Sequence, residues 1–89
     1  MNMEDETLKK YAFVIVSRYR VKIVKSLYEG CKIPSTISKE CEIQSGHVSK
    51  LLKELKKQNI IECINEDSKK GRLYRLTGEG IKIADYMDN

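Results

Sequence analysis

Apolar residues recur at helical spacing after Ser17, which is a plausible N-cap. Gly30 is expected to end this helix as a left-handed cap, so we predict a helix over about residues 18–29. The apolar positions are Val21, Ile23, Val24, Leu27 and Tyr28. The preceding run, residues 11–16, is β-branched and aromatic, and is compatible with either a short strand or the buried end of a helix that begins near Thr7.

Two further helices are predicted in the middle of the chain. Pro34 suits the first turn of a short helix over residues 34–41. A tight turn at 42–44 follows, after which Ser45 is expected to cap a third helix and Asn59 to end it in the left-handed conformation. The third helix carries an apolar stripe formed by Val48, Leu51, Leu52 and Leu55.

The last third of the chain predicts a β-hairpin and one more helix. Residues 60–64 and 72–76 are strand-like and flank a polar loop that ends in Gly71. Tyr74 is expected to pack beneath this hairpin. Thr77 then caps a short final helix, whose inner face is expected to carry Ile81, Ala84 and Met87.

The predicted elements define a mainly α fold with a small β-hairpin (α+β). Two short helices joined by a tight turn are typical of a helix-turn-helix, here at about 34–58, and the hairpin at about 60–77 would be its wing. We therefore predict one winged helix-turn-helix domain over residues 7–89, a three-helix core plus a wing, after a flexible N-terminus at 1–6.

Charge is distributed unevenly along the 89 residues, whose formal net charge is +4. Five basic residues and one acidic residue lie between 17 and 32, and five basic and three acidic residues between 33 and 58. Each end of the chain is slightly acidic. A basic centre in so small a domain is the electrostatic pattern of a nucleic-acid binder.

The sequence also argues against several other classes of protein. The longest apolar run, residues 12–16, is far shorter than the about 20 residues that cross a bilayer, and the acidic N-terminus lacks the features of a signal peptide. We therefore expect no membrane association and a cytoplasmic location. The three cysteines, Cys31, Cys41 and Cys63, are expected to be reduced core residues.

Neither a metal site, a cofactor nor catalysis is expected. Paired cysteine or histidine ligands at short spacing are absent, and His47 is the only histidine. His47 also has no catalytic partner at suitable spacing, and no nucleotide-binding, metalloprotease or nucleophile motif occurs.

Four segments give the chain a family resemblance: residues 17–20, 34–37, 47–55 and 70–77. In this order and spacing the chain resembles winged helix-turn-helix transcriptional regulators of the ArsR/MarR type, especially small archaeal ones. The resemblance implies sequence-specific binding of double-stranded DNA, with the third helix in the major groove and the wing on the phosphate backbone. The paired Cys or His ligands of metal-sensing relatives are missing here, so metal sensing is not implied.

The resemblance points to candidate DNA contacts on three parts of the fold. In the third helix and the turn before it these are Gln44, Ser45, Gly46, His47, Ser49, Lys50 and Lys53, in the wing Lys69, Lys70 and Arg72, and in the second helix Ser35. His47 is compatible with either a surface or capping role or a DNA contact. Arg18 and Arg20 are compatible with either phosphate binding or pairing with nearby acids.

The sequence leaves one alternative for the partner and gives one expectation for the assembly. A winged helix can instead bind protein or RNA, because a fold does not determine its partner. A homodimer is expected, because residues 11–16 and the apolar face of the final helix exceed what one small core needs. The sequence contains no indication of an effector ligand.

Overall fold

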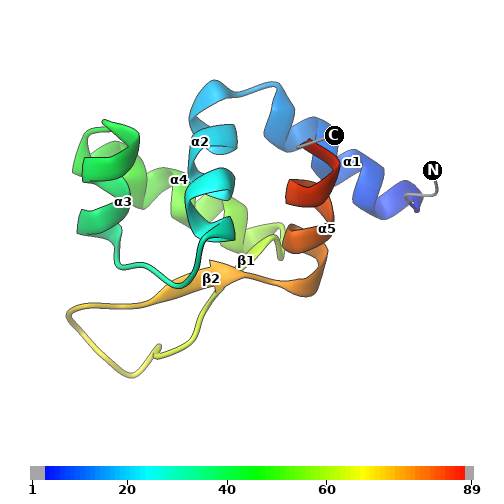
Figure 1. The fold of residues 1–89 in the computed structure, drawn as a ribbon. Helices are drawn as coiled ribbons and strands as arrows, with labels where there is room; N and C mark the ends of the chain where they lie inside the picture. The colour runs from blue at the N-terminus through cyan, green and yellow to red at the C-terminus, as the bar shows by residue number, and fades with distance from the viewer. Residues whose placement is uncertain (1–3, 88–89) are drawn as a thin grey trace.

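Within residues 4–87, five helices and one two-stranded hairpin form the fold (Figure 1). The computed structural model describes residues 4–87. The elements in chain order are α1 (Asp5–Ile15), α2 (Arg18–Tyr28), α3 (Pro34–Cys41), α4 (Ser45–Lys57), β1 (Ile61–Cys63), β2 (Tyr74–Leu76) and α5 (Gly78–Met87). Figure 1 shows α1 and α5 at one end of the molecule and α3 at the other, with the hairpin loop projecting from the helical body. The α+β winged helix-turn-helix fold predicted from the sequence is confirmed.

The three central helices were predicted within one residue, but two of their caps were not. Ser17 caps α2 as expected, since its side chain accepts a hydrogen bond from the Arg20 amide at 3.3 Å. Asn59 follows α4 with a left-handed φ of 61°. Gly30, however, has a φ of 150° and is not in the left-handed helical conformation. Ser45 is the first residue of α4 rather than its N-cap.

The apolar stripes of these helices meet in one core. Its fully buried members include Ile23, Ile37, Val48 and Leu55, so α2, α3 and α4 each contribute to it. Burying each such side chain contributes about 1.5–3 kcal/mol. The core thus fixes how α4 lies against the rest of the domain.

Residues 11–16, for which strand and helix were both open, belong mostly to α1. This helix begins at Asp5 with Glu4 as its N-cap, so it includes residues 5 and 6 of the segment 1–6 that the sequence predicts to be flexible, and residues 1–3 lie outside the described part. On its inner face Thr7 is buried and donates a hydrogen bond to Glu79 of α5 at 2.8 Å, and Lys10 pairs with the same carboxylate at 2.7 Å. These contacts hold α1 against α5.

The hairpin is antiparallel, and Cys63 faces Tyr74 across its two strands. Thr77 caps α5 as predicted, because its hydroxyl accepts a hydrogen bond from the Gly80 amide at 3.0 Å. The inner face of α5 was predicted correctly for Ala84 and Met87 but not for Ile81. It is formed by Gly80, Ile83 and Ala84, with Met87 packed beside them, whereas Ile81 is exposed.

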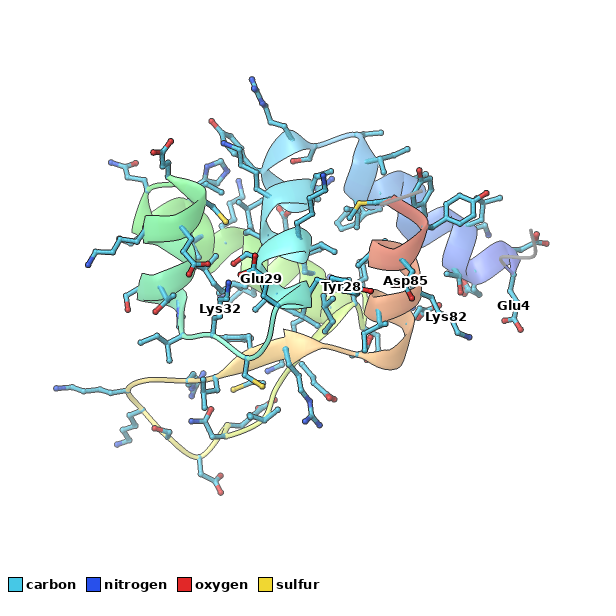
Figure 2. All side chains as sticks on the ribbon, in the orientation of Figure 1. Glu4, Tyr28, Glu29, Lys32, Lys82 and Asp85 are labelled. Atoms are coloured by element: carbon cyan, nitrogen blue, oxygen red, sulfur yellow. The ribbon has the colours of Figure 1, made fainter. Side chains whose placement is uncertain are left out.

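A hydrogen bond joins α2 to α5, and the three cysteines differ in burial. The Tyr28 hydroxyl of α2 donates a hydrogen bond to Asp85 of α5, and Figure 2 shows these side chains between the two helices. Cys41 is buried as expected, but Cys63 is only half-buried and Cys31 is exposed, so the prediction of three core cysteines is wrong for Cys31. Within residues 4–87, no helix is long and apolar enough to cross a membrane.

Candidate nucleic-acid interface

The outer face of α4 is small, polar and basic. Successive residues of an α-helix are about 100° apart, so the residues opposite the buried stripe form a single exposed row. That row contains Gly46, Ser49, Lys50, Lys53 and Lys57, all of which are exposed. Lys57 was not among the predicted contacts; a lysine near a helix C-terminus also interacts favourably with the helix dipole.

The flank of α4 that faces α2 is already occupied by contacts within the protein. His47 is exposed, and its ring packs edge-on against Tyr19 with the ring centres 5.0 Å apart. Arg20 pairs with Glu54 at 3.2 Å, donates to the Phe13 carbonyl at 2.8 Å and lies 3.7 Å above the Phe13 ring. Of its two roles open from the sequence, Arg20 shows pairing with an acid, so its guanidinium holds α1, α2 and α4 together.

The opposite flank of α4 borders a hollow between this helix and the wing. The hollow has a volume of about 220 Å³. It is lined by Pro34, Ser49, Leu52, Lys53, Lys56, Arg72 and Tyr74. It therefore brings two predicted candidates of α4, Ser49 and Lys53, together with Arg72 of the wing, which lies 23 and 19 residues further along the chain.

The wing loop is organised by its own hydrogen bonds. The Asn65 side chain accepts from the Leu73 amide at 2.6 Å and donates to the Gly71 carbonyl at 3.1 Å, which closes the base of the loop. Arg72 donates through Nε to the Ser68 carbonyl at 2.9 Å. Gly71 supplies the left-handed turn, with a φ of 64°. The loop thus has a defined shape without any partner.

One ion pair connects the wing to α4 and leaves the wing lysines exposed. Lys56 pairs with Glu66 at 2.8 Å, and the hydrogen bond between them raises the pKa of Lys56 and lowers the pKa of Glu66. Glu66 is thus paired with α4 and not with the lysines of its own loop. Across residues 4–87, Lys69 and Lys70 form no ion pair, and both are exposed.

Of the remaining predicted contacts, three lie at the start of α3 or α4, and Arg18 lies on α2, away from the hollow. Gln44 and Ser45 are exposed at the start of α4, and Ser35 is exposed next to Pro34 at the start of α3. Arg18 lies outside the hollow, because the helical spacing of α2 places it on the outward face of that helix with Lys22 and Lys25.

The order of the elements and the hollow beside α4 define a helix-turn-helix followed by a wing. The sequence matches the family model described as winged helix-turn-helix over residues 17–89. The chain therefore belongs to the winged helix-turn-helix family. No curated protein matches the sequence.

Solved structures of bacterial proteins share this fold at low sequence identity. Wild-type Lactococcus lactis ZitR in complex with DNA matches with a TM-score of 0.69 and 24% identity over 75% of this chain and 47% of that chain. The Staphylococcus aureus MepR–DNA complex matches with a TM-score of 0.74 and 19% identity over 94% of this chain and 68% of that chain. A third match is the homodimeric winged helix-turn-helix DNA-binding domain (fragment 1–100) of Mb0332 from Mycobacterium bovis, a possible ArsR-family transcriptional regulator. Its TM-score is 0.76, with 16% identity over 98% of this chain and 85% of that chain. This chain spans about half the length of the ZitR chains.

Proposed function

We propose that this protein binds double-stranded DNA sequence-specifically as a transcriptional regulator, with α4 in the major groove and the wing on the phosphate backbone. The observation that carries the proposal is that exposed basic side chains lie on the outer face of α4, around the hollow and in the wing. Lys53 and Arg72 line the hollow from its two sides. Lys69 and Lys70 extend the same charge along the loop.

This arrangement suits the geometry of DNA. The major groove is about 12 Å wide and admits an α-helix. Small residues at Gly46 and Ser49 allow the helix to approach the base edges closely, while Lys50 and Lys53 can donate to guanine or to phosphate. A wing beside such a helix reaches the neighbouring backbone. The DNA complexes of ZitR and MepR, which share the fold, support this reading.

We also propose that the protein acts as a homodimer through α1. Its outward face carries an apolar row of Leu8, Ala12 and Ile15, which Val16 at the C-cap continues. Leu8, Ile15 and Val16 are 48%, 45% and 77% exposed. The sequence leads us to expect residues 11–16 and the apolar face of the final helix at the interface. In the structure Val14 of the first segment is buried, and Ile81 is the member of the predicted α5 face that is exposed. The homodimeric fragment of Mb0332 supports this assembly.

The remaining parts of the proposal follow from binding DNA. A non-catalytic regulator of this kind needs no metal or cofactor for the contact itself, and a cytoplasmic location agrees with such a role. A winged helix that binds protein would be expected to show apolar side chains on the outer face of α4, whereas that face carries lysines and serine. RNA binding is an outcome of the experiment below.

Binding to a random DNA duplex, measured over a range of salt concentrations, tests the proposal. Each lysine that contacts phosphate adds about 0.9 to the slope of log affinity against log salt, so removing Lys69 and Lys70 together should flatten the slope by about 2 per bound subunit. The control variant loses Lys22 and Lys25 on the outward face of α2, which lowers the net charge equally.

The outcomes separate the competing functions. We expect the wing variant to flatten the slope clearly more than the control, and selection of bound duplexes to return an inverted repeat if the dimer reads two half-sites. If wild type and the variant without Lys69 and Lys70 gave equal slopes, these wing lysines would not contact phosphate. Binding to RNA but not to duplex DNA would overturn the proposal.

A further inference from the structure

Lys32 lies where α2, α3 and the wing meet. Its amide donates to the Tyr74 carbonyl at 3.0 Å, and the Tyr74 amide donates to the Lys32 carbonyl at 2.9 Å. The backbone at Lys32 thus pairs with β2 on the edge away from β1, as a one-residue third strand. These two bonds tie the connector between α2 and α3 directly to the wing.

The Lys32 side chain points to the helices. Its ammonium group donates to Ser26 of α2 at 3.0 Å, to Glu29 at the end of α2 at 2.8 Å, and to Glu40 of α3 at 2.5 Å. Figure 2 shows Lys32 and Glu29 next to each other where α2 ends. Ser26 in turn donates to Glu40 at 3.1 Å, so all four residues form one network.

The network holds a charged group in a sheltered position. Only 11% of the Lys32 side chain is exposed. Burial opposes the charge of Lys32, but hydrogen bonds and attraction from Glu29 and Glu40 outweigh it and raise the pKa of the ammonium. The Lys32 hydrogen bond, and then that of Ser26, lower the pKa of Glu40. All three donor hydrogens of the ammonium have partners in this arrangement.

Tyr74 connects Lys32 to the candidate interface. The backbone of Tyr74 pairs with Lys32, and Tyr74 also lines the hollow together with Lys53 of α4 and Arg72 of the wing. A shift of the Lys32 segment would therefore move a wall of the hollow and the base of the wing relative to α4.

We propose that Lys32 is a positioning residue that fixes the wing relative to α4, an inference that rests on the proposed DNA binding. Lys32 does not contact DNA in this scheme, because its ammonium is directed to Ser26, Glu29 and Glu40. It anchors the connector to α2 and α3, and the connector in turn holds β2. The second attachment of the wing is the Lys56–Glu66 pair, which is more exposed.

The test substitutes Lys32→Met, which keeps a straight apolar stem and removes the charge. The matched control is Lys25→Met, which has the same charge change on the outward face of α2, where no ion pair of Lys25 occurs within residues 4–87. We expect Lys32→Met to flatten the salt slope on random duplex by about 2, as removal of Lys69 and Lys70 does. Adding the Lys32 substitution to that double variant should flatten the slope no further.

Amide hydrogen exchange provides a readout that does not depend on DNA. The Tyr74 amide bonds to Lys32, whereas the Ile64 amide bonds within the hairpin to Leu73 at 2.9 Å. We expect Lys32→Met to speed exchange at Tyr74 at least tenfold relative to Ile64. The Lys25→Met control should leave the ratio of the two rates unchanged.

Each outcome supports or overturns the inference. A folded Lys32→Met protein with an unchanged slope, or with lower affinity at the same slope, would show that Lys32 does not position the wing. If wild type fails to bind DNA, the proposed function fails, while the exchange ratio still decides whether Lys32 holds the wing. Should Lys32→Met not unfold cooperatively, the Glu29→Gln/Glu40→Gln variant removes the same charge pairing and must give the same two effects.

Discussion

Replacing Gly80 by alanine should destabilise the protein, although the same change usually stabilises a helix. Gly80 lies in the buried face of α5, and a β-carbon there would be 2.2 Å from the Ile60 carbonyl oxygen and 3.2 Å from the Leu76 β-carbon. The carbonyl cannot easily move away, because it accepts a hydrogen bond from the Thr77 amide at 3.0 Å. Either α5 or the chain leading into β1 must therefore shift.

The magnitude follows from two opposing terms. Alanine is favoured over glycine in a helix interior by about 1 kcal/mol. Overpacking a tight interior costs about 1–3 kcal/mol, and a contact this far inside van der Waals distance, made to backbone, belongs at the upper end of that range. We therefore expect a net loss of about 1–2 kcal/mol. For a domain of this size the midpoint of thermal unfolding, Tm, would fall by about 4–16 °C.

The matched control is Gly78→Ala, in the same helix. A β-carbon at Gly78 meets nothing within 4 Å, and the residue is exposed. Urea and thermal unfolding of both variants would measure the difference. Gly78→Ala should leave the free energy of unfolding unchanged or slightly raised. A Gly80→Ala protein as stable as wild type would refute the close approach of α5 to Ile60.

Three further predictions concern recognition, assembly and pH. Ser49→Ala and Lys50→Ala should each reduce the preference for a selected duplex over random DNA by about 1–3 kcal/mol, as measured by competition titration; equal losses on both DNAs would show that these side chains contact only phosphate. Val16→Asp should give a folded monomer in light scattering, and a protein that stays dimeric would exclude the outward face of α1 as the interface. The pKa of Glu79 is lowered by its hydrogen bond from Lys10, so its contribution to stability is present at neutral pH and is lost as the pH falls through the lowered pKa. Unfolding measured from pH 6 to pH 3 should therefore show a weaker loss of stability in Glu79→Gln than in wild type.

The elements that the sequence predicted well are those with strong local patterns. The apolar stripe of α4 required no distant information, and its opposite face therefore predicted Lys50 and Lys53 as outer residues. Pro34 and Asn59 marked helix ends through their own backbone preferences. In each case the physical cause lies within a few residues along the chain.

The errors arise where the cause lies far away in sequence or involves no side chain. Gly80 is at the centre of the buried face of α5, but a glycine contributes nothing to an apolar pattern, so the pattern predicts the neighbouring row that includes Ile81. The pairing of Arg20 with Glu54 joins residues 34 apart. The Lys56–Glu66 pair likewise depends on how the wing folds against α4, which no local pattern encodes.

The Asn65 hydrogen bonds that close the wing loop have a consequence for the entropy of association. A loop that is ordered only on binding loses conformational freedom at that moment, and this loss subtracts from the affinity. Here the backbone around Lys69 and Lys70 is already restrained by Asn65, Ser68 and Arg72 before any partner arrives. Asn65 can therefore influence affinity without touching DNA, because it determines how much disorder the wing must give up when it binds.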